Sequence, residues 1–338
     1  MKKNNLSKII AGTITLLLSL SSVSCEPSDN LTLRLKKGLL YHQKVHLVSD
    51  LVMPPFPGAD YHDSELVLKY QVSDVDERGV ATLRITIESI KASMKSLTVS
   101  AAYDSSLPST DAGAGGSQNV NQRFQKCFQG LPGAGFGARL GADGRVIEIL
   151  DLDPPLQRVS TGPIIDETVG GYQVAHLFSP SHLRQYVALD MFYAWITNQP
   201  APEQNWTGSE PLETPRALPI MAQKTYKINE VKKENGDRVV IIVFETVGAP
   251  DQALPDFARL TGSRAQGEIT ITALNGAGGR VHFSFKHGRL IKLEEKIVAE
   301  VAFPGAQTRQ PNNPAGQISR TERKIYYKIE KTIEYLEK

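Results

Sequence analysis

The residue types that could perform chemistry are scattered along this chain. The densest group of metal-ligand types is Asp60-Tyr61-His62-Asp63, which follows a proline-rich stretch. Aspartate and histidine suit divalent metals, but on a proline-rich loop the pattern is more typical of a solvated turn. His42 and His46 would share one strand face but lie roughly 13 Å apart, too far for one zinc ion. The sequence therefore predicts no metal site and no cofactor.

The sequence also contains no motif that supports nucleophilic catalysis or nucleotide binding. The chain has no Gly-x-Ser-x-Gly motif, and Asp104-Ser105 at the end of an expected strand is typical of an Asx turn. Residues 133–138 match the Gly-x-Gly-x-x-Ala dinucleotide fingerprint, but no helical pattern follows them, so we expect a strand there. These motifs favour a protein that is not an enzyme.

The N-terminal segment predicts export. Lys2, Lys3 and Lys8 precede the apolar run Ile9–Leu20, and small residues follow. This pattern indicates a secretory signal peptide over residues 1–24, with an apolar run too short to span a bilayer. Removing these three lysines takes the formal net charge from +2 to −1. A nearly neutral chain favours no nucleic-acid partner.

Cys25 follows the expected cleavage site. A cysteine there resembles the acylated first residue of bacterial lipoproteins, although Ser22 stands where the usual pattern has leucine. The resemblance implies a lipid anchor at Cys25 and a tether over residues 25–30, with ordinary secretion as the alternative. Glu26, where aspartate would signal inner-membrane retention, favours the periplasmic face of the outer membrane. If Cys25 is acylated, no second cysteine is left to form a disulfide with Cys127, so the fold must rely on a real core.

Alternation with period two dominates the chain after residue 30. Residues 66–72 and 80–87 alternate around a polar turn and predict a hairpin, which Lys95–Ala102 extends into a meander. Proline and glycine over 54–58 predict a loop. Further strands are expected at 31–36, 40–47, 124–128, 136–140, 145–150, 224–231, 238–247, 267–274, 280–286, 289–302 and 319–336.

One helix is expected, at about residues 180–198. Ser179 supplies an N-cap, and Pro180 occupies the first helical position. Its second half is apolar on nearly all sides, which predicts burial between sheet layers or lobes. Four of its residues could line a cavity for an apolar ligand, or could simply fill the core: Tyr186, Met191, Phe192 and Trp195.

Prolines punctuate residues 199–220 and predict a linker. It would separate an N-terminal β lobe, residues 31–198, from a C-terminal β lobe, residues 221–338. Short matches between the halves leave open two related lobes or half-barrels. The expected fold class is mainly β (β-rich α+β), with antiparallel meander sheets and one buried central helix.

Several short motifs resemble a family of uncharacterised bacterial lipoproteins of unknown function. They are Cys25 after a signal peptide, Tyr103-Asp104-Ser105, Phe128-Gln129-Gly130 and Pro200–Trp206. The resemblance spans roughly residues 31–293 and brings no activity with it. Gln204-Asn205 stands where the family has Gly-Asp.

These features together predict a lipid-anchored envelope protein that binds an apolar ligand or lipid. Antiparallel sheets closed by an apolar helix resemble the half-barrel carriers that shelter acyl chains. The main alternative is a structural or assembly partner in the envelope, acting through edge strands or glycine-rich loops. An envelope hydrolase is less favoured and depends only on residues 60–63 and Asp104-Ser105.

Overall fold

The computed structural model describes most of the chain after residue 30. Residues 31–338 form one compact unit, and residues 1–30, the expected signal peptide and tether, form a second unit outside the described part. The described ranges are 31, 33–53, 56–96, 98–107, 120–161, 174, 177–188, 204–213, 219–248, 252–254, 269–274, 276–303 and 323–336. Four of the expected functional residues lie outside these ranges: Cys25, Met191, Phe192 and Trp195.

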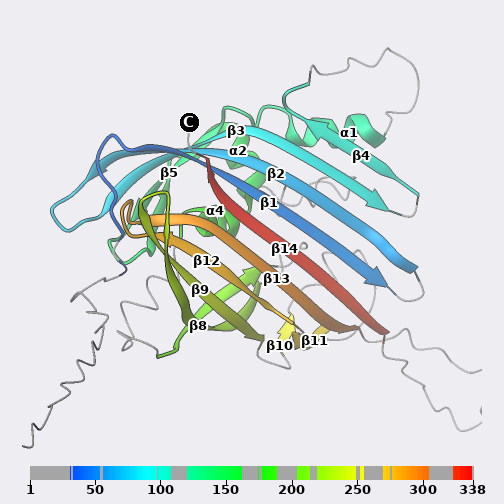
Figure 1. Ribbon diagram of the computed structural model, residues 1–338. Helices are drawn as coiled ribbons and strands as arrows, with labels where there is room; N and C mark the ends of the chain where they lie inside the picture. The colour runs from blue at the N-terminus through cyan, green and yellow to red at the C-terminus, as the bar shows by residue number, and fades with distance from the viewer. Residues whose placement is uncertain are drawn as a thin grey trace, which may run out of the picture. The chain divides into compact units, whose positions relative to one another are not determined.

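Fourteen strands in the described ranges join in one antiparallel sheet, which confirms the mainly β prediction (Figure 1). They are β1 (Leu40–Met53), β2 (Phe56–Val75), β3 (Ala81–Ser96), β4 (Ser100–Asp104), β5 (Gly135–Leu140), β6 (Val146–Leu150), β7 (Trp206–Glu213), β8 (Pro219–Glu234), β9 (Asp237–Gly248), β10 (Gln252–Leu254), β11 (Ile269–Leu274), β12 (Gly278–Ser284), β13 (Arg289–Phe303) and β14 (Arg323–Leu336). Across the sheet the order is β6-β5-β3-β2-β1-β14-β13-β12-β9-β8-β7. β4 pairs with β3, β11 with β13, and β10 with β11.

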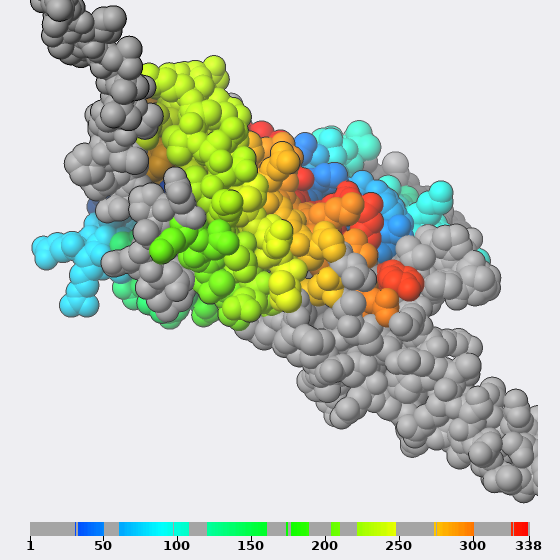
Figure 2. Space-filling model, turned by 60° about the horizontal axis from the view of Figure 1, so that its bottom comes forward, coloured from blue at the N-terminus to red at the C-terminus, as the bar shows by residue number. Residues whose placement is uncertain are grey.

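The first and last strands in chain order, β1 and β14, are hydrogen-bonded neighbours in the middle of the sheet. β1 pairs with β2 on one side and with β14 on the other. Figure 2 shows the result, with the orange and red C-terminal strands lying against the blue and cyan N-terminal ones. The two halves of the chain are therefore parts of one sheet.

The expected linker over residues 199–220 is wrong where the structure describes it. It contains β7, which pairs with β8 along its whole length. Pro211 lies within β7, and β7 ends the strand order. An edge strand tolerates proline because the missing N–H costs no ladder hydrogen bond on its outer side. Of the prolines that suggested a linker, Pro211 therefore belongs to an edge strand, and Pro219 begins β8.

Strand alternation gives the sheet two different faces. One, which we call the apolar face, has a row of apolar register partners from β3 to β8: Ile90, Leu66, Val45, Ile333, Leu293, Val281, Ile242 and Ile228. The other, which we call the charged face, carries ion pairs such as Lys44–Glu65 at 2.6 Å and Lys292–Glu294 at 2.8 Å. A sheet of this kind must cover its apolar face.

Three helices lie within the described ranges, where one was expected. They are α1 (Val120–Phe128), α2 (Pro154–Thr161) and α4 (Pro180–Val187). The strand expected at 124–128 is wrong, because these residues belong to α1. Phe124 and Phe128 are both fully buried, and their spacing of four places them on one helical face. The segment is too short for that period to stand out from alternation.

The expected central helix begins correctly but ends early. The Ser179 hydroxyl accepts a hydrogen bond from the His182 N–H, and Pro180 opens the helix. Ala188, however, is extended, with φ −65° and ψ 142°, so α4 ends at Val187. The continuation to residue 198 is therefore wrong at its first step, and residues 189–198 lie outside the described ranges.

Three strand boundaries also differ from the sequence analysis. Residues 33–36 are irregular, because the Arg34 N–H donates to the Gly288 carbonyl at the turn after β12. β2 begins at Phe56 and contains Pro57 and Gly58, so the loop expected over 54–58 is wrong for residues 56–58. The expected strand 95–102 is split between the end of β3 and the start of β4.

Candidate functional site

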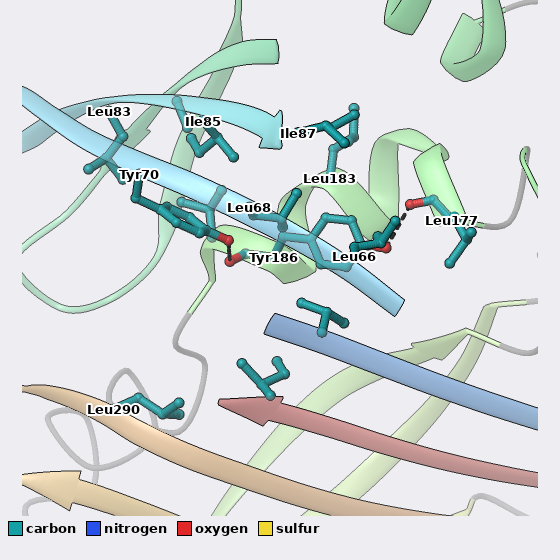
Figure 3. Close-up of a cluster of buried hydrophobic side chains, with 14 of the residues drawn as sticks. Leu66, Leu68, Tyr70, Leu83, Ile85, Ile87, Leu177, Leu183, Tyr186 and Leu290 are labelled. Atoms are coloured by element: carbon teal, nitrogen blue, oxygen red, sulfur yellow. Dashed lines mark hydrogen bonds between the residues drawn. The ribbon is translucent and has the colours of Figure 1, made fainter. Parts of the chain in front are cut away.

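Tyr186, the one expected ligand-binding residue within the described ranges, joins α4 to the apolar face (Figure 3). Its backbone carbonyl accepts a hydrogen bond from the Tyr70 hydroxyl at 2.8 Å, and its own hydroxyl donates to the Leu177 carbonyl at 2.8 Å. Tyr186 is 5% exposed and belongs to the same buried core as the fully buried Leu66 and Leu68. This is the arrangement of a core residue, the alternative that the sequence left open.

The apolar face continues well past the helix into the C-terminal half. Buried residues of β13 and β14 lie on it, among them Ile297, Ala299, Ile329 and Ile333. On β7, β8 and β9 it becomes aromatic. Trp206 stacks on Tyr226 with ring centroids 5.5 Å apart, and Tyr226 meets Phe244 at 5.5 Å.

Charged side chains interrupt this face along one line. Lys224 of β8 and Glu295 of β13 form an ion pair at 2.8 Å, and their side chains are only 6% and 7% exposed. Two strands, β9 and β12, lie between these residues in the sheet. The pair can span them because Gly279, the register partner of Glu295, has no side chain to obstruct it.

Phe244 supports this crossing. Its ring lies over Gly279, where an added Cβ would come within 2.6 Å of the ring. The Lys224 Nζ sits 4.9 Å from the centroid of the same ring, a cation–π distance. The Lys224 ammonium group therefore contacts both the face of the Phe244 ring and the Glu295 carboxylate.

Lys331 completes the line. It is the register partner of Glu295 on β14, and we call Lys224, Glu295 and Lys331 the charged row. Burial raises the pKa of the Glu295 carboxyl, but the charges of Lys224 and Lys331 and the hydrogen bond from Lys224 outweigh it, so this pKa lies below its ordinary value. The Glu295 carboxyl is therefore ionised at neutral pH.

Two polar groups border the charged row. Burial, reinforced by the charge of Lys331, lowers the pKa of His182 of α4 to about 3, so this imidazole is neutral at physiological pH. Thr246, the register partner of Lys224 on β9, is 5% exposed. Its hydroxyl is buried and has no hydrogen-bond partner in the described part of the chain. Such a group is costly to bury, and a hydrogen bond to a ligand would offset that cost.

One feature of the sequence marks the members of this row. Lys224 is in phase with Ala222 and Tyr226, in the alternation that marks the buried side of β8. Glu295 is likewise in phase with apolar residues on the buried side of β13, and Lys331 is so on β14. A charged residue at a strand position that alternation assigns to the buried side is the pattern that would have identified them. The sequence does not indicate, however, that these three residues on three separate strands lie close together.

The structure separates the other sequence candidates from this row. Residues 60–63 lie on β2, where His46 Nε2 contacts Asp63 Oδ1 at 2.8 Å on the charged face. His42 Nδ1 contacts Glu88 Oε2 at 2.7 Å on the same face. No group of three or more metal-ligand side chains occurs among the described residues.

The two nucleophile and nucleotide candidates are structural. The Asp104 carboxylate accepts hydrogen bonds from the N–H and hydroxyl of Ser106, which confirms the expected Asx turn. The Ser105 hydroxyl accepts from the Ile90 N–H at 2.9 Å. Residues 135–140 form β5, paired antiparallel with β3 and β6, which confirms the expected strand.

Comparisons with known proteins place the chain in no family. No protein-family model matches the sequence, and no curated protein matches it. Among solved structures, the chain is similar to one described as lipid–protein interactions in lipovitellin, with a TM-score of 0.41 and 9% identity over 90% of this chain. The match covers about a quarter of the lipovitellin chain, 26%.

A second solved structure, DynF from the dynemicin biosynthesis pathway of Micromonospora chersina, matches with a TM-score of 0.17 and 5% identity. That match covers 90% of this chain and 85% of DynF. Neither TM-score reaches the range in which a shared fold is inferred, so the function has to be argued from the chain's own residues. Across the described ranges, no helix is long and apolar enough to cross a membrane.

Proposed function

We propose that this chain is a non-catalytic binding protein of the cell envelope that holds an apolar ligand or lipid against the apolar face of its sheet. A lipid on Cys25 would anchor it to the membrane, with the periplasmic face of the outer membrane as the favoured location. The anchor rests on the sequence pattern alone.

The observation that carries the binding proposal is the width of the apolar face. From β2 to β8 the strand order contains six spacings of about 4.8 Å, or roughly 29 Å. α4 has eight residues, which makes it about 12 Å long. α4 is therefore shorter than the face is wide. Most side chains of the face are buried, and the proposal places an acyl chain beside α4 within this buried layer, where contact between apolar surfaces is favourable on both sides.

Native mass spectrometry of the full chain carrying Cys25→Ala tests the binding. The substitution removes the proposed covalent lipid, so any lipid mass that remains is a bound ligand. We expect complexes with one or more lipid masses, released under denaturing conditions. Ligand-free protein alone, even after incubation with lipid vesicles, would contradict the proposal.

Metabolic labelling with palmitate tests the anchor separately. We expect label on the exported wild-type chain and none on the Cys25→Ala variant. Equal labelling of both chains, or labelling of neither, would refute acylation at Cys25 and leave ordinary secretion.

A further inference from the structure

The charged row occupies an unusual place for an ion pair. On the charged face the Lys44 and Glu65 side chains keep 34% and 29% of their surface exposed, whereas Lys224 and Glu295 keep 6% and 7%. Taking both charges out of water costs about as much as their attraction returns, and apolar residues of similar size would often serve stability as well or better. Stability alone therefore does not account for charges at this position, whereas ligand recognition does.

The surroundings of the row match a ligand with two chemically different parts. An aromatic and aliphatic surface flanks it, formed by Phe244 and Tyr226 on one side and Ile297 and Ile329 on the other. The row itself presents ammonium groups, and the Thr246 hydroxyl beside it is buried without a hydrogen-bond partner in the described residues. A long apolar chain fits the first surface, and an anionic head group fits the second.

We propose that Lys224 and Lys331, together with the Thr246 hydroxyl, bind the carboxylate or phosphate head group of an anionic lipid whose acyl chain lies on the apolar face. This inference rests on the proposed function and specifies its ligand class. Hydrogen bonds from ammonium groups to an anion are the stronger kind, and the low dielectric of a buried face strengthens them. Glu295 holds the Lys224 ammonium in place between ligands.

Competition between matched ligands tests this. The full chain carrying Cys25→Ala is loaded with the neutral dye N-phenyl-1-naphthylamine, which is then displaced by myristate or by tetradecanol of the same chain length. We expect myristate to displace the dye at a concentration lower by about tenfold or more, because only its head group is charged.

Two variants locate this preference, each with a matched control. Lys331→Met should abolish the preference for the acid, whereas Lys328→Met, on the charged face of the same strand, should preserve it. The double variant Lys224→Met/Glu295→Leu should also abolish it while still binding the alcohol. Its control, Lys44→Met/Glu65→Leu, removes an ion pair from the opposite face and should leave the preference intact.

The outcomes separate the two proposals. If neither ligand displaces the dye, or the dye does not bind, the proposed function fails. If acid and alcohol compete equally with the wild-type chain, apolar binding stands and the head-group site is refuted. A preference for the acid that survives in both Lys331→Met and Lys224→Met/Glu295→Leu also refutes it, because the row would then be only structural. The circular dichroism spectrum of each variant confirms that it is folded.

Discussion

Asp153 connects three parts of the N-terminal half through one carboxylate. Its Oδ2 accepts hydrogen bonds from Arg84 Nη2 of β3 at 2.5 Å and from the Gly135 N–H of β5 at 2.7 Å. Its backbone carbonyl accepts from the Gln157 N–H in the first turn of α2. The hydrogen bond from Arg84 is the main cause of the lowered pKa of this carboxyl. One residue thus fixes β3, β5 and α2 relative to one another.

Asp153→Asn should therefore weaken the fold in a pH-dependent way. Because the folded-state pKa lies below the unfolded value, the stabilisation is present at neutral pH and is lost as the pH falls through the folded-state pKa. At neutral pH we expect a loss of about 1 kcal/mol, small because the site is partly exposed. Urea unfolding of both proteins at several pH values measures it. A difference that grows toward acid would contradict this account.

Lys224 and Glu295 should show the asymmetry of a buried ion pair. Lys224→Met alone leaves the Glu295 carboxylate buried beside a lost partner and should cost about 3–5 kcal/mol. The double variant Lys224→Met/Glu295→Leu should be close to the wild type or more stable. Thermal unfolding of the single and double variants decides this. A double variant that is no more stable than the single one would show that the pair has another structural role.

At the scale of elements, hairpins were the most predictable part of the sequence. The turn between β8 and β9 places Asn235 and Gly236 at φ 48° and 78°, which these two residue types adopt most easily. β8 alternates before the turn and the apolar run of β9 follows it, so local residues determined the pairing. The same holds for β5 and β6 and for β12 and β13. Such elements need no information from distant parts of the chain.

The elements that were missed depend on distant partners. α1 is nine residues long; the ring of its buried Phe128 stacks on Tyr103 of β4 at 5.3 Å and meets Phe124 at 5.1 Å. The end of α4 at Val187 could not be read from the apolar residues that follow it. The pairing of β1 with β14 joins residues far apart in the chain, such as His42 and Leu336, which are 294 positions apart. The charged row was hidden for the same reason, since its members come from three strands.

The attachment of α4 to the sheet can be tested through one hydroxyl. Tyr70→Phe removes the donor to the Tyr186 carbonyl in a fully buried place and leaves the ring packing intact. We expect a loss of about 1–2 kcal/mol. Hydrogen exchange should show faster exchange over residues 180–187 than in the wild type, with β8 and β9 unchanged. Uniform acceleration across the chain would mean that α4 does not open on its own.

At the scale of the whole unit, β1 and β14 join the described strands of residues 31–338 in a single sheet. Strands of the two chain halves share a ladder, so unfolding one half exposes the edge of the other. We expect one cooperative transition in urea, with tryptophan fluorescence of a Trp195→Phe variant, which reports on Trp206, coinciding with far-ultraviolet circular dichroism. Two separated transitions would instead indicate two lobes that unfold independently.

The central claim is that ligand lies on the apolar face, and photo-crosslinking tests it most directly. A fatty acid with a diazirine in its acyl chain is bound to the Cys25→Ala protein, irradiated and mapped by peptide mass spectrometry. On β13 and β14 the account predicts adducts at residues such as Ile297 and Ile329, reduced by excess unlabelled myristate, and none at their neighbours Val298 and Lys328 on the charged face. Adducts on the charged face, or adducts that myristate does not reduce, would contradict it.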